Sequence, residues 1–275
     1  MTNPELPRLS PSIAKIMVER SPLHAWQAHR LLGGGDGSES TPAQNVGKVL
    51  EALIFNQPVQ GPDSQFAILN FDNYKKAAAQ EARDDALAHD KTPILARELE
   101  VHMAAGVIIK RRLADQGVVF DGGEYQKLVE WTCGLTGANC KGFLDYYRDG
   151  IIWDLKCVDN ASPRKVQRSF VDYGWDIQSA AYRDGIETNY PDLAGRVRAI
   201  YAFAETSPPY AVHLYEPDGM MRSLGEEKWH EAKRRWVDCL DTNTWPGYFS
   251  GIGQITPLPW QLTAMEDFET TEEVK

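Results

Sequence analysis

The stretch that most constrains the fold of this chain is 141–156, which predicts a β-hairpin. Two runs rich in aromatic and β-branched residues flank Asp149-Gly150, which suits a tight two-residue turn of the primed type. A turn there places Asp145 directly opposite Asp154, and the period-two alternation of strands puts Lys156 on the same face. The other face is predicted to be apolar and to join the core, with Leu144, Tyr146, Trp153 and Leu155.

Two carboxylates paired in this way favour a cation between them. Their β-carbons would lie about 5 Å apart, and like charges there are destabilising unless a cation intervenes or one acid is protonated. Mg²⁺ accepts one or two carboxylates together with substrate phosphates, and Lys156 could orient a water or stabilise charge on a phosphate. Asp-x-Lys alone is common and more typical of a solvated face. The hairpin register makes the two interpretations about even.

Composition narrows the class of protein. The chain has 275 residues and a formal net charge of −10, which argues against a nucleic-acid-coating protein but not against an enzyme whose basic residues are gathered locally. Its four cysteines form no Cys-x-x-Cys pair, so a zinc or cluster site has weak support and free thiols are expected. No apolar run could cross a membrane, and the N-terminus lacks a signal-peptide pattern, so a cytoplasmic location is expected.

Two further patterns place polar groups beside apolar ones on predicted helices. Glu51 interrupts the apolar pattern of a helix that opens at Thr41, so it either falls on the exposed edge or supplies a third carboxylate to the metal site. Gln178 and Tyr182 are four residues apart and share one helix face. Their amide, ring and hydroxyl suit a nucleotide, although an ordinary core edge is the more common explanation of such a pair taken alone.

Three cations, Arg164, Lys165 and Arg168, lie in the first turns of a helix predicted to start near Ser162. Cations at a helix N-terminus oppose the macrodipole, so an anion such as a phosphate is expected nearby. A solvated basic helix start remains an equally good interpretation.

The order of predicted elements indicates one α/β domain of the α+β layered type, with a mixed sheet. Residues 1–120 are expected to be mainly helical and residues 121–215 to form the sheet that carries the site. Residues 216–275 are expected to form a long helix and an irregular aromatic cap over the core.

Several boundaries within these parts are also predicted. A helix is expected to start at Thr92-Pro93, and the last long helix is expected over 224–240. The Gly-rich stretch 33–40 is expected to be a flexible loop, Pro257-Leu258-Pro259-Trp260 to belong to the aromatic cap, and the acidic end 266–275 to fray.

Taken in order, these motifs resemble the PD-(D/E)XK nuclease superfamily. The resemblance is to its RecB/RecE-like branch, which includes the C-terminal nuclease of exonuclease VIII of prophage recombination systems, and it runs from about Leu9 to Trp260. It rests on Glu51, Lys141-Gly142-x-x-Asp145, Asp154-x-Lys156 and Gln178-x-x-x-Tyr182. A restriction-endonuclease-like core is therefore expected, with a central mixed β-sheet flanked by helices.

The resemblance also implies roles for the site residues. Asp145 and Asp154 would be metal ligands, assisted by the carbonyl of Leu155, and Lys156 would position or activate the attacking water. Relatives in this branch often have His where this chain has Glu51. Other branches use Glu on the equivalent helix, so a metal role for Glu51 is still expected.

The implied activity is an exonuclease. With Mg²⁺, or Mn²⁺ in its place, the chain would hydrolyse linear double-stranded DNA from an end, 5′ to 3′. It would act as a trimeric or tetrameric ring and pass the single strand to a RecT-like annealing protein. Gln178 and Tyr182, with Arg164, Lys165 and Arg168, would belong to the substrate side.

Four alternatives remain open at this stage. A metal-dependent endonuclease would also cut closed circular DNA, and a retaining glycosidase, which also needs two carboxylates about 5 Å apart, would survive EDTA. An iron–sulfur nuclease of the kind used in CRISPR adaptation would be coloured, although the cysteines lack its paired spacing. A non-catalytic DNA-binding module would not need an intact Asp/Asp/Lys set.

Overall fold

The computed structural model describes residues 6–35, 41–259 and 261–262. Most of the Gly-rich loop (36–40), Trp260 of the expected aromatic cap and the acidic end expected to fray lie outside the described residues. No described helix is both long enough and apolar enough to span a bilayer.

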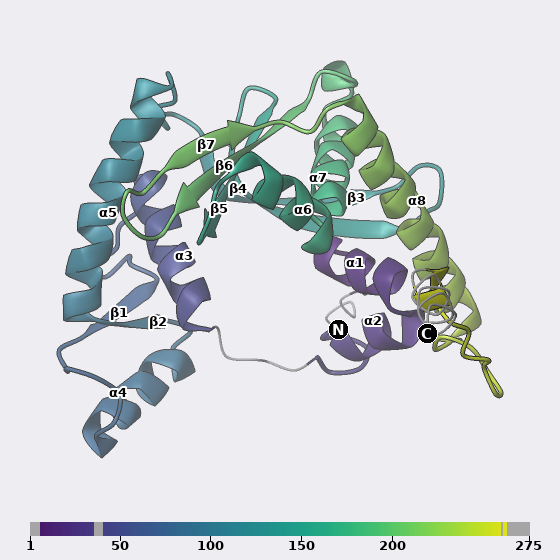
Figure 1. Ribbon diagram of the computed structural model, residues 1–275, viewed down its shortest axis with the longest axis horizontal. Coiled ribbons are helices and arrows are strands. Elements are labelled where there is room, and N and C mark those ends of the chain that lie inside the picture. Colours follow the sequence, from purple (N-terminus) through teal and green to yellow (C-terminus); the bar gives the residue numbers. More distant parts are fainter. Residues whose placement is uncertain (1–5, 36–40, 260, 263–275) are drawn as a thin grey trace, which may run out of the picture.

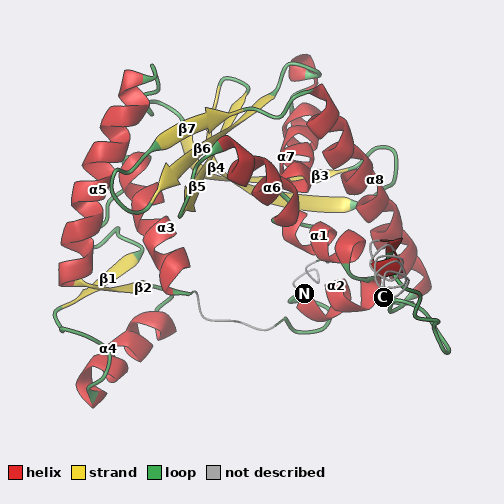
Figure 2. Cartoon of the chain, viewed as in Figure 1, coloured by secondary structure: helices red, strands yellow, loops and turns green. Residues whose placement is uncertain are grey.

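The chain begins with helices, forms the strands of its main sheet in two groups separated by helices, and ends in a long helix (Figures 1 and 2). The helices are α1 (Pro11–Glu19), α2 (Pro22–Ala28), α3 (Pro42–Ile54), α4 (Ala77–Ala88), α5 (Ala96–Asp115), α6 (Pro163–Asp172), α7 (Trp175–Asn189), the short 3₁₀ helix η1 (Pro191–Leu193) and α8 (Gly219–Thr242). The strands are β1 (Phe66–Leu69), β2 (Thr92–Leu95), β3 (Glu124–Thr132), β4 (Asn139–Arg148), β5 (Ile151–Val158), β6 (Arg198–Glu205) and β7 (Val212–Tyr215).

The main sheet is mixed, as predicted. Its order is β3-β4-β5-β6-β7, with β5 and β6 parallel and the other neighbours antiparallel. A parallel pair needs a crossover connection, which α6 and α7 supply between β5 and β6. Helices cover both faces: α3 and α5 lie at one side of Figure 1 and α1, α7 and α8 at the other. The predicted fold class is confirmed.

The hairpin turn forms where the sequence predicts it. Asp149 and Gly150 have φ angles of 50° and 80°, the left-handed values that a type I′ turn requires at both central positions. The ladder between β4 and β5 begins at Arg148↔Ile151 and ends two pairs later at Tyr146↔Trp153, in the predicted register.

Beyond that point the two strands separate, so the predicted direct pair of Asp145 with Asp154 is wrong. The Asp145 carboxylate instead accepts a hydrogen bond from the backbone N–H of Leu155 at 3.0 Å. The neighbouring β3–β4 register also skips this position, where Gln126 of β3 has a φ of 46°. Like charges directly opposite on a sheet are destabilising, and the local distortion of both strands avoids that pairing.

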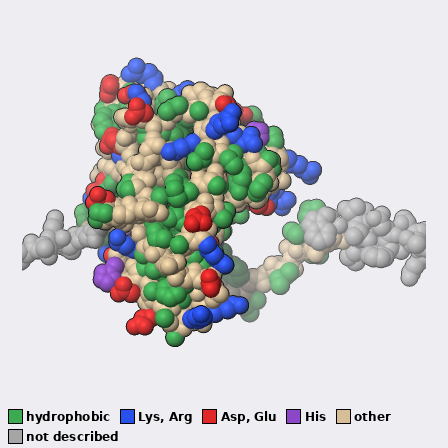
Figure 3. All heavy atoms as spheres, turned by 90° about the vertical axis from the view of Figure 1, so that its left-hand side faces the viewer, with side chains coloured by type: hydrophobic (Ala, Val, Ile, Leu, Met, Phe, Trp, Pro, Cys, Tyr) green, Lys and Arg blue, Asp and Glu red, His purple; other side chains and the backbone are tan. Residues whose placement is uncertain are grey.

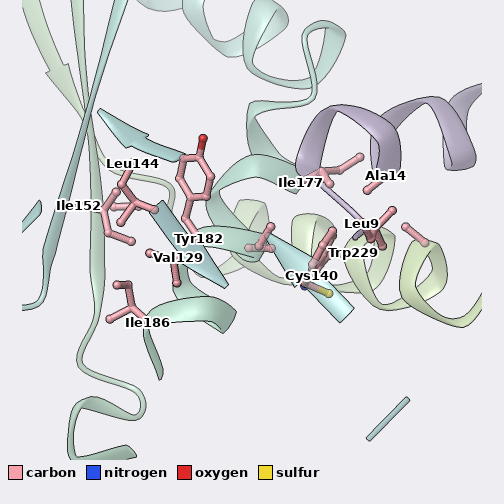
Figure 4. Close-up of a cluster of buried hydrophobic side chains, with 14 of the residues drawn as sticks. Leu9, Ala14, Val129, Cys140, Leu144, Ile152, Ile177, Tyr182, Ile186 and Trp229 are labelled. Carbon is pink, nitrogen blue, oxygen red and sulfur yellow. The ribbon is translucent and has the colours of Figure 1, made fainter. Parts of the chain in front are cut away.

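This distortion also breaks the alternation of faces. Leu144 packs in a first core, with Ile152 and side chains of α1, α6, α7 and α8 (Figure 4). Tyr146, Trp153 and Leu155 pack in a second core with α3 and α5 on the other face. The prediction that Leu144 shares a face with the other three is therefore wrong, because the period-two pattern does not continue through Asp145.

A fork opens where β4 loses β5 as its neighbour. Further along β4 the same edge is taken by Leu9, which accepts from the Lys141 N–H at 2.9 Å and donates to the Asn139 carbonyl at 2.8 Å. In the described part of the chain, Gly142 to Asp145 have no strand partner on this edge. We call this opening, between 142–145 of β4 and 154–156 of β5, the β4–β5 fork.

The helical N-terminal part contains a small second sheet that the sequence analysis missed. Thr92-Pro93 starts a strand rather than a helix: β2 pairs in parallel with β1, and α5 begins only at Ala96. The pairing with a distant apolar segment overrides the local helix signal of a proline. The last helix, α8, also begins earlier than predicted, at Gly219, where the Asp218 side chain caps the Met221 N–H at 2.8 Å.

The predicted aromatic cap is largely wrong. Trp245 packs edge-on against Trp236 with ring centroids 5.5 Å apart. Beyond it the chain leaves the core, since Tyr248 and Phe249 are 66% and 71% exposed. Proline and glycine here prevent a regular element, and the chain instead contacts α2 at the surface, where the Tyr248 ring lies 5.3 Å from that of His24.

Candidate active site

Four elements deliver the predicted site residues to the β4–β5 fork. Helix α3 carries Glu51, strand β4 carries Asp145, strand β5 carries Asp154 and Lys156, and helix α7 carries Gln178 and Tyr182. The acids and the lysine are close enough to alter one another's protonation. The structure thus brings together residues that are up to 131 positions apart (51 to 182).

Lys156 and Asp154 form the most buried ion pair of the fork. The Lys156 Nζ lies 2.6 Å from the Asp154 Oδ1, with the two side chains 16% and 2% exposed. Burial disfavours the charged lysine, but the attraction of Asp154 and Asp145 outweighs it, so the pKa of Lys156 is raised. The amine therefore keeps its proton at neutral pH and acts as a fixed positive charge.

Both oxygens of Asp154 are buried and lack a hydrogen bond. Its contact with Lys156 is short enough for an ion pair but does not meet hydrogen-bond geometry. A buried carboxylate is costly unless it is paired and hydrogen-bonded. These two oxygens are therefore open to a further positive group.

The raised pKa values of the other two acids also indicate an excess of negative charge at the fork. Burial and the charge of Asp154 raise the pKa of Asp145 well above its usual value. Burial, with a smaller contribution from Asp154, also raises the pKa of Glu51, although the side chain of Gln126 donates a hydrogen bond to it. Three acids facing one lysine leave negative charge uncompensated.

Oxygen donors with uncompensated charge suit a hard divalent cation such as Mg²⁺. The unbonded oxygens of Asp154 are donors of this kind, and all three acids offer the carboxylate oxygens that such a cation prefers. The donors do not form a complete coordination sphere, because among the described residues no three His, Cys, Asp or Glu side chains lie at metal-binding positions. Asp145 is held by Leu155 and Asp154 by Lys156.

Gly142 lets α7 approach β4 at the fork. A β-carbon there would lie 2.8 Å from the ring of Tyr182, so only glycine permits this contact. Tyr182 packs with Leu144 and Ile152 and directs its hydroxyl away from Val129 (Figure 4). That hydroxyl accepts from the Gln178 amide at 2.9 Å, which leaves the buried Gln178 Oε1 unbonded.

We expect Gly142→Ala to lower the free energy of unfolding by about 1–3 kcal/mol, because overpacking a filled site forces neighbours to move. Denaturant unfolding followed by circular dichroism measures this change. Gly134→Ala is the matched control, since a β-carbon at Gly134 meets nothing within 4 Å. Equal stability of the two variants would contradict the close packing of Tyr182 on β4.

Two cavities flank the fork. The first, of about 620 Å³, is lined by Lys141, Gly142, Gln178 and Tyr182 among others. The second, of about 550 Å³, is lined by Lys156 and Lys165 among others. The structure therefore places Gln178 and Tyr182 on one side of the site and Lys156 on the other.

Only one of the three predicted cations of α6 lines a cavity at the fork. Lys165 lines the second cavity. Arg164 and Arg168 are exposed and line neither cavity, and Arg168 pairs with Asp172 at 3.6 Å. Arg164 and Arg168 thus fit the solvated-helix interpretation.

Sequence reasoning missed the residues that support the charged groups. Gln126 bonds to Glu51 from a backbone conformation that no local pattern indicates. The rings of Trp175 and Tyr201 lie 5.3 and 5.9 Å from the Lys156 Nζ. The available signal for Tyr201 was its place in the apolar run 199–204, because a buried tyrosine hydroxyl needs a hydrogen-bond partner.

Comparison with known proteins supplies a family and a fold. Residues 23–256 match the family described as a PDDEXK-like domain of unknown function (DUF3799). A solved structure of a candidate exonuclease from Eubacterium rectale has a TM-score of 0.58 at 14% identity, covering 94% of this chain and 93% of its own. It shares the fold. No curated protein sequence matches the chain.

Two other solved structures are more distant. A phage-related exonuclease from Haemophilus somnus 129PT has a TM-score of 0.32 at 14% identity, covering 70% of this chain and 94% of its own. An alkaline exonuclease from Laribacter hongkongensis has a TM-score of 0.28 at 13% identity, covering 70% and 91%. Scores this low carry no argument about the present chain.

Proposed function

Because the chain belongs to the PDDEXK-like family DUF3799, whose model matches residues 23–256, we propose that it is a metal-dependent deoxyribonuclease. The observation that carries the proposal is the buried Asp154 carboxylate, with two unbonded oxygens, held beside the charged Lys156. Metal-assisted phosphodiester hydrolysis uses a cation site and a positive charge next to the phosphate. The β4–β5 fork combines donors for the cation with the charge of Lys156.

Asp145, Asp154 and Glu51 would hold the ion, which we take to be Mg²⁺, with Mn²⁺ as a substitute. The backbone carbonyl of Leu155 would assist: the N–H of Leu155 donates to Asp145, and the N–H and C=O of one strand residue point to the same side. Bound there, the ion would act as a Lewis acid that makes water a better nucleophile and offsets charge on the leaving oxygen.

The protein's own side chains would orient the water, stabilise charge on the phosphate and hold the substrate. Lys156, which keeps its proton, would orient the attacking water and stabilise the negative charge that develops on the phosphate. Gln178 and Tyr182 would hold the substrate on the first-cavity side, and Lys165 would contact a backbone phosphate on the second. Arg164 and Arg168 would add only long-range attraction, since they line neither cavity.

We further propose that this single nuclease domain degrades linear double-stranded DNA 5′ to 3′ in the cytoplasm of a bacterial or phage-infected cell. It would pass the remaining strand to a RecT-like annealing protein and assemble as a ring of three or four copies. The helix α5 offers apolar surface for such contacts, since Val101 and Val107 are 58% and 69% exposed. Figure 3, which views the molecule from the α5 side of Figure 1, shows hydrophobic side chains among scattered charges.

We expect the purified chain to degrade end-labelled linear duplex DNA with Mg²⁺, to leave closed circular duplex intact, and to lose all activity in EDTA. An exonuclease needs an end, so the closed circle is the internal control of the same reaction. Gel electrophoresis of both DNAs at matched times measures the outcome. Inactivity on linear DNA with either Mg²⁺ or Mn²⁺ contradicts the proposal.

The same experiment separates the alternatives. Cutting of the closed circle indicates an endonuclease, DNA cleavage that survives EDTA indicates a metal-free nuclease, and DNA that is bound but left intact indicates a non-catalytic module. A glycosidase, which does not hydrolyse phosphodiester bonds, would leave both DNAs intact. An iron–sulfur cluster has no support from the cysteines, because Cys157 packs in the second core while Cys133 and Cys140 pack in the first.

A further inference from the structure

The corner between α6 and α7 carries two stacked aromatic rings that separate the two cavities of the site. Tyr173 and Trp175 have ring centroids 5.0 Å apart and planes inclined by 28°. Both residues line the first cavity and the second. We call this pair the Tyr173–Trp175 ridge.

The ridge is fixed at its base and open at its top. Trp175 packs edge-on against Phe203 at 5.2 Å, and its backbone carbonyl accepts from the Tyr201 hydroxyl at 3.2 Å. Tyr173, stacked on Trp175 from outside, remains 64% exposed. An aromatic ring with one covered face, at the border of two cavities, offers its exposed surface to a flat ligand.

The surroundings of the ridge favour a nucleic-acid strand as that ligand. The Lys156 Nζ lies 5.3 Å from the Trp175 ring, so the ridge adjoins the proposed reaction site. Among the described residues that line the first cavity, Lys15 and Lys141 are cationic and none is acidic, although the whole chain carries a net charge of −10. Phe143, 51% exposed, adds another ring to the same wall.

We propose that Tyr173 is a stacking platform for an unpaired nucleobase of the DNA substrate, next to the bond that is cut. The inference rests on the proposed nuclease function and names how that site holds its strand. Single-strand-binding grooves combine cations that follow the backbone with aromatic rings that stack on bases. The Tyr173–Trp175 ridge and the first cavity contain both features, and stacking on Tyr173 selects DNA ends with unpaired bases.

The test measures binding apart from cleavage. The full chain carrying Asp154→Asn, which prevents cutting, is titrated with fluorescein-labelled duplexes that are blunt or carry a 5′ or 3′ single-stranded extension, and anisotropy is recorded. Adding Tyr173→Ala is expected to weaken binding of an extended duplex about 5- to 150-fold, the usual effect of removing one base-stacking ring. Tyr173→Phe keeps the ring and is expected to bind as the parent does.

Two controls separate stacking from a structural effect. Tyr190→Ala removes a ring that is 41% exposed and stacked on Tyr147, outside both cavities, and should leave binding unchanged. Abasic nucleotides placed one at a time along the extension should weaken binding to the parent at one position near the duplex. This second arm decides the question even if Tyr173→Ala does not fold.

The inference is overturned if Tyr173→Ala binds as the parent does, if Tyr173→Phe loses as much affinity as Tyr173→Ala, or if no abasic position matters. These failures are distinct from failure of the nuclease proposal. If the parent chain cuts linear DNA but binding does not depend on the Tyr173 ring, only the stacking proposal is wrong. If binding depends on the ring but the parent chain cuts no DNA, the stacking proposal stands and the nuclease proposal is wrong.

Discussion

Replacing Lys156 with alanine is expected to slow hydrolysis of linear DNA by about a hundred- to a thousandfold, the usual effect of removing one preorganised charge from a transition state. The raised pKa of Lys156 keeps the amine protonated, because Asp154 and Asp145 outweigh the effect of burial. Its role is therefore electrostatic, and no uncharged side chain replaces it. Initial rates of nucleotide release from an end-labelled duplex measure the loss.

Lys127→Ala is the matched control. Lys127 also forms an ion pair at 2.6 Å, with Glu124, and lies 5.2 Å from an aromatic ring, that of Tyr147. It reproduces the contacts of Lys156 away from the acid cluster, so its removal should leave the rate unchanged. Lys156→Ala also leaves Asp154 buried without its partner, which costs about 3–5 kcal/mol in comparable pairs. Rates are therefore compared at a temperature where circular dichroism shows both variants folded.

If Lys156→Ala, folded by this criterion, retains most of the parent's rate, the catalytic assignment of the β4–β5 fork fails. Equal losses in Lys156→Ala and Lys127→Ala would point instead to a general effect on the sheet.

Mg²⁺ is expected to stabilise the folded chain, and Asp154→Asn is expected to abolish that effect. An ion present at a hundred times its dissociation constant adds about 2.7 kcal/mol, which raises the unfolding temperature of a domain of this size by about 5–10 °C. The stabilisation arises because the Asp154 oxygens lack hydrogen bonds and are open to a positive group in addition to Lys156. Thermal unfolding with and without Mg²⁺ measures it without any DNA.

The control here is Asp159→Asn, because Asp159 is an exposed acid just beyond β5 that lines the second cavity, and its replacement should leave the Mg²⁺ effect intact.

The Mg²⁺ effect is expected to depend on pH because the pKa values of Asp145 and Glu51 are raised, mainly by burial and further by their acidic neighbours. A raised folded pKa means that the folded protein binds protons more tightly than the unfolded chain.

Without metal, that contribution to stability grows as the pH falls from above the folded pKa towards the unfolded value, and it is lost again as the pH rises. Protons and Mg²⁺ compete for the same acids, so the Mg²⁺-induced shift should shrink as the pH is lowered from neutral. A shift that persists in Asp154→Asn, or that does not depend on pH, would place the ion elsewhere.

The sequence alone determined the features that depend on neighbours a few residues apart. Asp149-Gly150 favours the positive φ angles that a type I′ turn requires, and this turn sets the first ladder pairs of the hairpin. Period-two alternation grouped Asp154 with Lys156 on β5. Ser10 before Pro11 marks the start of α1, where its side chain accepts from the Ile13 N–H. In each case the feature depends on interactions within a short segment, and no distant element overrides it.

The tertiary structure decided where charge could be buried. Local geometry predicted a direct pair of Asp145 with Asp154, and that prediction is wrong. The strands separate there because two opposed carboxylates are unfavourable and the Leu155 N–H offers one of them a partner. Whether Glu51 faced solvent or the fork depended on α3 packing against β5 and on Gln126, which no periodicity connects to it.

The same holds for the groups around Lys156. Trp175 and Tyr201 reach its amine only because the α6–α7 crossover sets α7 and β6 beside β5. Local pattern thus specified which chemical groups the chain carries on each element. Their surroundings were set by long-range packing, since the free energy of a buried charge depends on every element that contacts it rather than on its neighbours in sequence.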